Sequence, residues 1–354
     1  MKILQVTPRY RPHTGGVETH VAELSERLVA RGHDVTVFAA DAEEGLPRRE
    51  TRDGVRVRRF RGFAPGGAFH VAPGIAPAVR RVAPDVIHAH NYHSLPVFFA
   101  ALGTEFGASA GGGGEGPRFV VTPHYHGGSA SGFRDKLLSL YRPLGGWALD
   151  RADELIAVSD WERDRLRADF GVEATVIPNG LNVERFADAT PEERGRPYLL
   201  CVGRLEEYKG VQHAIRALSE LPEYDLLVAG SGDFREELEA IARREGVASR
   251  VEFLGYVPDE RLPGLYAGAS TYLLLSSFEA YGMTVAEALA AGTPSIVRTG
   301  SALDDWVSDS GVVGVETVEP ATITATVGEV RNADPEDARI VTWETVVDEV
   351  ETRY

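Results

Sequence analysis

The chain has 354 residues, of which 43% are hydrophobic and 25% are charged, a balance typical of a folded globular protein. Its length predicts two domains, its net charge of −16 argues against general nucleic-acid binding, and its single cysteine, Cys201, excludes a disulfide framework. No stretch reaches the ~18 apolar residues that span a bilayer, and the first residues lack a signal-peptide pattern. We therefore expect a cytoplasmic protein, with peripheral contact to the inner face of the membrane left open.

The first half of the chain alternates short apolar runs with amphipathic helices. Residues 3–6 predict a strand, apolar residues recur at helical spacing from Val17 to Leu28, and residues 35–38 predict the next strand. Further buried strands are predicted at 85–88, 119–122, 154–158 and 175–177. Ser159 and Glu162 form an S-x-x-E capping box that begins a helix. Strand, helix and strand at this spacing indicate a parallel doubly wound sheet.

A second series of the same kind begins at Tyr198. Strands are predicted at 198–202, 225–229, 251–254, 271–275 and 295–297, with helices at 211–220, 234–245, 259–267 and 284–291 between them. The turn-rich stretch from Pro178 to Pro197 is suited to a linker. Because ligands of doubly wound sheets bind beyond the carboxyl ends of the strands, two such domains predict a ligand cleft.

Positive charge is concentrated in the first half. Residues 1–175 contain 22 Lys and Arg against 21 Asp and Glu, and the remainder contains 15 against 32. The densest cluster comprises Arg48, Arg49, Arg52, Arg56, Arg58, Arg59 and Arg61. Alternation of valine with arginine from Val55 to Arg58 predicts a strand with one solvated face, and the alternative is a basic surface for an anionic acceptor or lipid headgroups. The glycine-rich segment 109–117 predicts a loop.

Several chemistries lack their motifs. The chain contains no Asp-x-Asp, no His-Glu-x-x-His, no His-x-x-x-His, no G-x-x-x-x-G-K-[ST] loop, and no G-x-G-x-x-G after the first strand. These absences weigh against dinucleotide redox chemistry, P-loop hydrolysis and a dedicated metal site. We therefore expect no metal ligands and no cofactor.

Glycine and basic residues follow the first strand of each series instead. Gly15 and Gly16 precede the first helix, where free amides can bind an anion, although a plain turn explains the pair equally well. Arg204 and Lys209 follow strand 198–202 at a helix start, where two cations can neutralise a diphosphate; ordinary surface placement of both is the alternative.

The run from 276 to 294 holds two glutamates, Glu279 and Glu287. Free amides at the start of the helix between them are suited to phosphate, and the acidic side chains can hold sugar hydroxyls. These amides belong to Gly282, Met283 and Thr284. Two structural alternatives stay open: Glu279 as a solvated loop acid, and Glu287 as the partner of Thr284 in a T-x-x-E capping box.

Together these motifs resemble the family 4 glycosyltransferases of the GT-B fold, over essentially the whole chain. The matching segments are Gly15-Gly-Val-Glu18, Thr122-Pro-His-Tyr-His-Gly127, Val158-Ser159 with Glu162, Val176-Ile-Pro-Asn-Gly180, Glu184-Arg-Phe186, Gly203-Arg-Leu205 with Lys209-Gly210, Gly230-Ser-Gly232, Phe253-Leu-Gly255, and the E-x7-E pair Glu279 and Glu287. The resemblance implies an α/β protein with two Rossmann-like doubly wound parallel-sheet domains facing across a cleft. Residues 1–180 would form the acceptor side, residues 181–335 would bind the nucleotide sugar, and a C-terminal helix in 336–354 would return to the first domain.

The resemblance also implies a role for each matching residue. Gly16 lies against the donor, Arg204 and Lys209 bind its diphosphate, the amides of Gly282, Met283 and Thr284 meet phosphate, Glu287 holds the ribose, and Glu279 contacts the transferred sugar. His124 matches the active-site histidine, so that His124 and Glu279 are the expected catalytic residues. His126 is the second choice, because a continued strand would turn it to the opposite face. His88, His90 and His93 are expected to line the cleft or pack.

The implied activity is a retaining, metal-independent transfer of a hexose, of the mannose or glucose type, from a nucleotide-diphosphate sugar to a glycan or lipid-linked acceptor. Such transfer serves polysaccharide or glycolipid biosynthesis or protein glycosylation. Residues 300–306 depart from the family's G-G-x-x-E loop, with Asp304 or Asp305 as substitutes. Two alternatives remain: a nucleotide-sugar-binding protein without transfer activity, which this departure suggests, and a phosphorolytic enzyme of the same fold.

Overall fold

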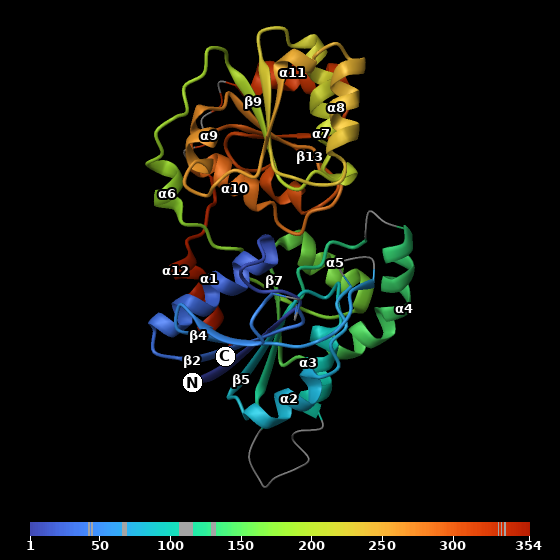
Figure 1. Cartoon of the computed structure of the whole chain (residues 1–354), viewed down its shortest axis with the longest axis vertical. Helices are drawn as coiled ribbons and strands as arrows, with labels where there is room; N and C mark the ends of the chain where they lie inside the picture. The colour runs from blue at the N-terminus through green and yellow to red at the C-terminus, as the bar shows by residue number, and fades with distance from the viewer. Residues whose placement is uncertain are drawn as a thin grey trace. The chain divides into compact units, whose positions relative to one another are not determined.

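The computed structural model describes residues 1–41, 43, 45–65, 69–105, 116–128, 132–331, 333, 335 and 338–354, with the side chains of 132–134 excepted. The chain divides into two compact units, Met1–Gly180 with Trp343–Tyr354 (unit 1) and Leu181–Thr342 (unit 2) (Figure 1). The sequence-based boundary falls between the same two residues. The returning C-terminal segment begins at Trp343 rather than at residue 336. Of the predicted loop 109–117, residues 109–115 lie outside the described residues.

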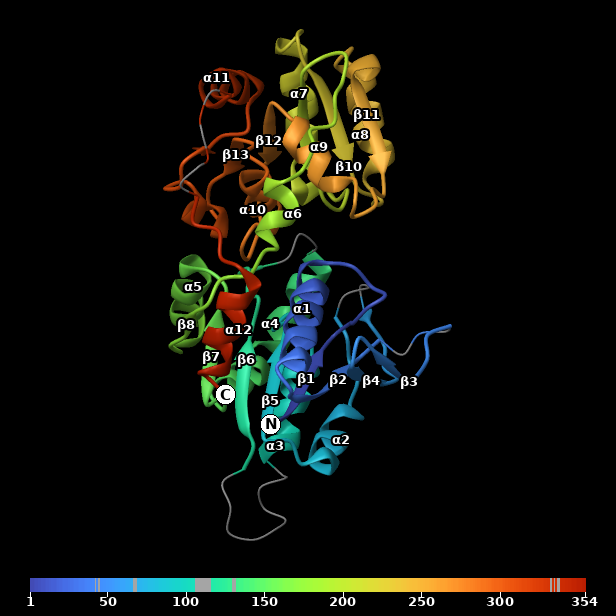
Figure 2. The same ribbon diagram turned by 90° about the vertical axis from the view of Figure 1, so that its left-hand side faces the viewer.

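Unit 1 is built on an eight-stranded sheet in the order β3-β4-β2-β1-β5-β6-β7-β8 (Figure 2). Its strands are β1 (Lys2–Thr7), β2 (Asp34–Ala39), β3 (Arg49–Arg52), β4 (Val55–Arg59), β5 (Val86–His90), β6 (Arg118–Thr122), β7 (Glu154–Ala157) and β8 (Thr175–Val176). Neighbours are parallel except β3 and β4. The apolar pattern missed β3, because this edge strand carries polar side chains throughout.

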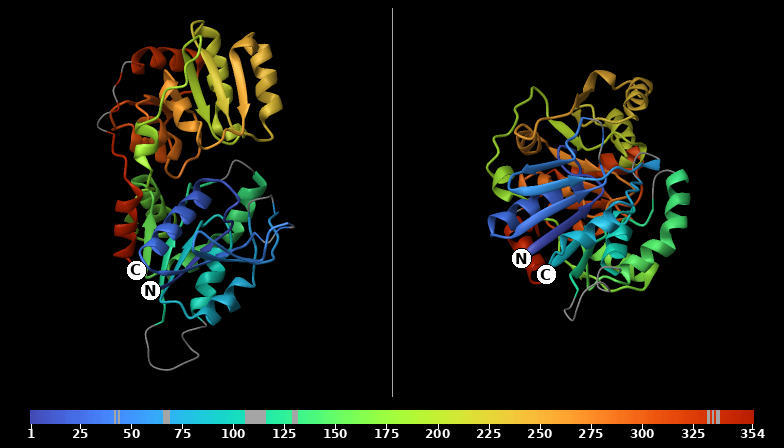
Figure 3. Two further views of the ribbon diagram at one scale, coloured as in Figure 1. Left: turned by 60° about the vertical axis from the view of Figure 1, so that its left-hand side comes forward. Right: turned by 60° about the horizontal axis from the view of Figure 1, so that its bottom comes forward.

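The helices of unit 1 are α1 (Gly16–Ala30), α2 (Ile75–Val82), α3 (Pro96–Glu105), α4 (Gly132–Leu149), α5 (Asp160–Phe170) and α12 (Trp343–Glu351). Helix α3 packs against α2 and α4, while α1 packs against α12 (Figure 3). The Ser159 half of the predicted capping box is confirmed: the Ser159 hydroxyl accepts a hydrogen bond from the Glu162 amide at 3.0 Å, while the Glu162 carboxylate accepts from the Val158 amide at 2.7 Å. No helix among the described residues is long and apolar enough to cross a membrane.

Helix α12 joins the end of the chain to unit 1. The guanidinium of Arg31 on α1 forms ion pairs with Asp348, at 2.6 Å, and with Glu351. A Cβ on Gly180 would lie 2.7 Å from the Trp343 Cα, so only glycine permits this close approach. The C-terminal helix therefore returns to the first domain, as the resemblance implies.

The central strands β1 and β5 are buried along nearly their whole length, as expected for a parallel sheet covered on both faces. Four polar side chains interrupt this apolar pattern: Gln5, Thr7, His88 and His90 are fully buried. Because buried polar groups require hydrogen-bond partners, these positions indicate a polar site inside unit 1.

Unit 2 is built on a six-stranded parallel sheet in the order β11-β10-β9-β12-β13-β14. Its strands are β9 (Tyr198–Val202), β10 (Asp225–Ala229), β11 (Val251–Gly255), β12 (Thr271–Leu274), β13 (Ser295–Arg298) and β14 (Val312–Val315), and its helices are α6 (Val183–Ala187), α7 (Val211–Ala217), α8 (Arg235–Arg244), α9 (Leu262–Gly268), α10 (Met283–Ala290) and α11 (Pro320–Val330). The second predicted sheet is confirmed, with β14 as an added edge strand that the sequence analysis missed.

Candidate functional site

The loop after β9 carries the two predicted cations of unit 2. A single turn of 3-10 helix, Glu207–Lys209, ends at Gly210, which has φ of 77°. A Cβ at Gly210 would lie 2.1 Å from the Leu275 carbonyl oxygen, so the loop rests directly on the end of β12. Glycine at this position is therefore required both for the left-handed backbone and for the contact that places Lys209.

Lys209 and Glu279 meet across these two loops. The Lys209 Nζ donates a hydrogen bond to Glu279 Oε1 at 2.6 Å, and the two side chains are only 18% and 16% exposed. Burial is the largest single influence and acts to lower the pKa of Lys209, but the charge of Glu279, the Tyr208 side chain and the hydrogen bond to Glu279 together raise that pKa. The solvated-acid alternative for Glu279 is therefore wrong, because this carboxylate forms a largely buried ion pair.

Arg204 is the more exposed cation, with 64% of its side chain accessible. Its guanidinium pairs with Glu206 at 2.8 Å and donates to the Tyr208 hydroxyl at 2.8 Å. Arg204 and Lys209 both line a small pocket at the ends of β9, β10 and β12. This pocket has a volume of only about 10 Å³, so an anion that meets both positive charges would lie outside it, where the accessible Arg204 can turn toward the anion.

The N-terminus of helix α10 forms the next part of this candidate site. Gly282, with φ of 95°, is the N-cap residue and brings no side chain to cap the helix. The amides of Met283 and Thr284 are in the first turn, where helix dipole and free N–H groups favour an anion. The predicted amides thus occupy a helix N-terminus.

The T-x-x-E alternative for Glu287 is wrong, because α10 begins one residue earlier and its N-cap residue is Gly282, which has no side chain to cap the helix. Glu287 instead accepts a hydrogen bond from the Tyr266 hydroxyl at 2.7 Å. Burial raises the pKa of Glu287 to about 7, with the Tyr266 hydrogen bond acting in the opposite direction. The carboxylate is half-buried and keeps a second oxygen for a ligand.

Residues 300–306 form hydrogen bonds with the backbone of the loop that carries Glu279. They form a short 3-10 helix, Ala302–Trp306, whose Ala302 amide donates to the Glu279 carbonyl at 3.3 Å. The Trp306 indole donates to the Tyr281 carbonyl at 2.6 Å. Asp304 is exposed and accepts from the Gly300 amide at 2.9 Å. Although residues 300–306 depart from the family's sequence pattern, they still form a hydrogen bond with the backbone of Glu279.

The two remaining predicted site residues, Gly16 and His124, lie in unit 1. Gly16 opens α1, is exposed, and has nothing within 4 Å of a hypothetical Cβ. Two residues along, the Glu18 carboxylate accepts from Arg9 at 2.9 Å and lies against Gly15. The negative charge of Glu18 therefore lies next to the positive end of the α1 helix dipole, which is a favourable interaction.

His124 follows β6 in a left-handed conformation, with φ of 48°, so the strand does not continue through it. The argument that put His126 on the opposite face is wrong for that reason; His126 stacks on His93, with ring centroids 3.8 Å apart. The next amide, that of Tyr125, is held by the buried Glu162 carboxylate, which also accepts from Val158 at 2.7 Å. Burial raises the pKa of Glu162 to about 8.

His124 also lies beside two other histidines, His20 on α1 and His90 at the end of β5, with ring centroids 5.0 and 5.9 Å away. The sequence analysis did not single out His20. No sequence motif includes His20. Only its position in the topology could have indicated it, because the first turns of α1 lie beyond the carboxyl end of β1.

Known proteins resemble this chain over both units. Residues 14–185 match the family described as Glycosyltransferase Family 4, and residues 182–336 match Glycosyl transferases group 1. The chain is 30% identical to glycogen synthase of Mycobacterium tuberculosis over 359 aligned positions, covering 89% of this chain and 82% of that protein. The chain belongs to the family 4 glycosyltransferases.

A second relative of this family 4 transferase is a GDP-mannose-dependent phosphatidylinositol monomannoside mannosyltransferase of Mycolicibacterium smegmatis. The two are 29% identical over 365 positions, which cover 95% of this chain and 90% of that protein. Among solved structures, HepE of Anabaena in complex with UDP and glucose superposes with a TM-score of 0.77 at 16% identity, covering 99% and 98% of the two chains. The fold is therefore GT-B.

Proposed function

We propose that this family 4 transferase moves a hexose, of the mannose or glucose type, from a nucleotide-diphosphate sugar to a glycan or lipid-linked acceptor. The Lys209–Glu279 pair carries the proposal, because its ammonium group and carboxylate lie 2.6 Å apart beside the uncapped start of α10. One bound sugar diphosphate can give phosphate oxygens to the cation and sugar hydroxyls to the anion. The UDP and glucose in HepE, and the GDP-mannose dependence named for the M. smegmatis relative, support this donor class.

The proposed reaction retains the anomeric configuration. The bond from the anomeric carbon to the diphosphate oxygen breaks, its electron pair leaves with the diphosphate, and the acceptor hydroxyl attacks from the same face while its proton passes to that leaving oxygen. Arg204 and Lys209 stabilise the developing charge, so that no divalent cation is needed at the diphosphate. In this proposal Glu287 holds the ribose, while Gly16 and His124 of unit 1 contact the donor sugar.

A thermal-shift panel of GDP-, UDP- and ADP-linked mannose and glucose tests the donor site. A donor present at a hundred times its Kd stabilises the folded state by about 2.7 kcal/mol, so one nucleotide should raise Tm well above the others. No shift with any nucleotide sugar would contradict the proposal.

Transfer itself separates the proposal from its two alternatives. Glu279→Gln should abolish sugar release or transfer, while Glu236→Gln, an exposed glutamate of α8, should leave it unchanged. Binding of a donor with neither hydrolysis nor transfer would favour a nucleotide-sugar-binding protein. A requirement for inorganic phosphate would favour a phosphorolytic enzyme.

We also propose that the Arg48–Arg61 region contacts an anionic acceptor or the headgroups of the inner membrane face. Arg48, Arg49 and Arg61 are exposed, and Phe63 beside them is 64% exposed. Arg59 does not contribute, because it is buried in ion pairs with Asp41 and Glu50. Sedimentation with anionic vesicles should be lost when Arg48, Arg49 and Arg61 become serine; retention at equal salt would exclude this surface.

A further inference from the structure

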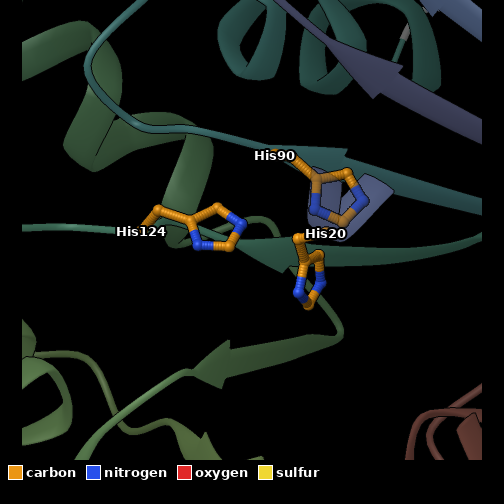
Figure 4. Close-up of side chains that lie close together, drawn as sticks. All are labelled: His20, His90 and His124. Carbon is orange, nitrogen blue, oxygen red and sulfur yellow. The ribbon is translucent and has the colours of Figure 1, made fainter. Parts of the chain in front are cut away.

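The backbone at His124 has an unusual conformation for a residue that carries a side chain. His124 follows β6 with φ of 48°, in the left-handed region that favours glycine. Its side chain is only 6% exposed and lies beside His20 and His90 (Figure 4). A left-handed backbone at such a residue persists only where the surrounding structure holds it. The contacts of the neighbouring peptide groups therefore decide where the His124 ring lies.

The two peptide groups that flank His124 are each held by a hydrogen bond. On one side, the Pro123 carbonyl accepts from the Tyr92 amide at 2.7 Å. On the other side, the Tyr125 amide donates to Oε1 of Glu162. Because φ and ψ of His124 are the rotations between these two planar peptide groups, the two hydrogen bonds together fix its backbone.

Glu162 reaches this loop from the first turn of α5. Its side chain is fully buried, and its second oxygen accepts from the Val158 amide at 2.7 Å. The side chain of Tyr125 is fastened to the same helix, since its hydroxyl donates to Asp169 at 2.8 Å. Helix α5 therefore holds the residue after His124 by both its backbone and its side chain.

A carboxylate suits this position because two acceptors are needed. Both oxygens of Glu162 face backbone N–H groups, so a glutamine would bring its own N–H groups against one of two donors. Burial raises the pKa of Glu162, and the two amide hydrogen bonds act in the opposite direction. The hydroxyl of Ser159 already caps the start of α5. The side chain of Glu162 is therefore free to serve the loop that carries His124.

We propose that Glu162 is a positioning residue for His124. It acts through the Tyr125 amide: by fixing one of the two flanking peptide groups it sets the left-handed backbone, and with it the place of the imidazole ring. Glu162 does not itself touch the substrate. This inference rests on the proposed function, in which His124 contacts the donor sugar. It gives the S-x-x-E motif a second role beside the start of α5.

A double-mutant cycle tests the inference most sharply. Glu162→Gln should lower kcat/KM for transfer by about 10–100-fold, because a displacement of about 1 Å in an active site can cost that much. The same substitution made in His124→Ala should lower kcat/KM by less than about threefold, since no ring remains to be positioned. Equal losses in the two backgrounds would overturn the inference.

Ser159→Ala is the matched control, because it removes the hydroxyl that caps α5 and leaves the Glu162 carboxylate present. We expect a lower Tm and a kcat/KM within about threefold of the parent. A loss of kcat/KM as large as in Glu162→Gln would mean that both residues act only through the stability of α5, which would contradict positioning. If Glu162→Gln does not fold, Glu162→Asp, which keeps both oxygens but shortens their reach, replaces it under the same criteria.

Carbon-13 NMR of the chain labelled at histidine reports on the backbone of His124 without any activity. The Cα resonance of His124, assigned by its absence in His124→Ala, should shift in Glu162→Gln and keep its place in Ser159→Ala. An unmoved resonance in Glu162→Gln would overturn the inference, also where His124→Ala has no measurable transfer. If the resonance shifts but the parent chain transfers no sugar, the proposed function has failed and the positioning stands. Transfer that Glu162→Gln leaves unchanged means that the positioning has failed alone.

Discussion

Units 1 and 2 keep polar groups inside their folds in opposite ways. In unit 2 the buried cation Lys209 keeps its charge because Glu279 lies 2.6 Å away. In unit 1 the buried histidines His20, His90 and His124 avoid charge, because burial lowers the pKa of each. The charged side chains of an ion pair can instead bind an ionic ligand, whereas a neutral imidazole offers a lone pair to a hydrogen-bond donor or a cation. The two units are thus prepared for different chemistry.

The largest effect is expected from removing the charge in unit 2. Lys209→Met should lower kcat/KM for transfer by about 10²–10³, the usual cost of losing one electrostatic contact to a leaving group. Lys2→Met is the matched control, because Lys2 is an exposed lysine of unit 1. Steady-state kinetics with the selected donor measures both. A Lys209→Met enzyme within threefold of the parent would break the contrast between the units.

A second prediction separates backbone strain from crowding. Gly210 and Gly171 both have left-handed backbones, with φ of 77° and 71°, but a Cβ meets the Leu275 carbonyl at 2.1 Å only at Gly210. Gly171→Ala should cost about 1 kcal/mol of unfolding free energy, and Gly210→Ala at least about 2 kcal/mol more. Urea denaturation measures both. Equal losses would mean that the Lys209 loop does not rest on β12.

The neutral histidines of unit 1 predict an acid-sensitive fold. Burial lowers the pKa of His20 from its ordinary value of 6.5 to about 4 in the folded chain, while the hydrogen bond with the Asn179 side chain acts in the opposite direction. The unfolded chain therefore binds the proton first, so stability is full above pH 6.5 and falls as pH drops toward 4, by up to about 3 kcal/mol.

Unfolding followed by tryptophan fluorescence between pH 7 and 4 measures this slope. His20→Gln should flatten it. The matched variant is His213→Gln in unit 2: burial also lowers the pKa of His213 to about 4, so this variant should flatten the slope of unit 2, which holds Trp306, and leave unchanged the slope of unit 1, which holds Trp147, Trp161 and Trp343. An unchanged slope in His20→Gln would show that His20 is not held neutral.

The smallest effect concerns Glu287. Glu287→Gln keeps an oxygen to accept from the Tyr266 hydroxyl but removes the charge, so stability should change by under about 1 kcal/mol. If the second oxygen holds a ribose, the donor KM should rise about tenfold with kcat little changed. Tyr266→Phe is the companion variant, since it removes the hydroxyl alone. A KM unchanged by Glu287→Gln would remove Glu287 from the donor site.

The contrast between the units also explains what the sequence could predict. Lys209, Glu279 and the start of α10 lie in local motifs, where glycine and charge at fixed spacing specify loop and helix end. The 3.6-residue pattern could not tell whether α10 begins at Met283 or Thr284, because the capping atoms are backbone. The cluster in unit 1 comes from three separate elements, so that no spacing in the chain indicates it. The family resemblance singled out His124, but its neighbours His20 and Gln5 depend on strand order and register.

Hydrogen exchange with and without the selected nucleotide sugar tests the central claim most directly. The claim is that unit 2 binds the donor through the Gly203–Gly210 loop and the start of α10. We expect donor-induced protection of peptides covering 203–210 and 278–287, and loss of that protection in Lys209→Met. Protection confined to unit 1, or equal protection in the parent and Lys209→Met, would contradict the claim.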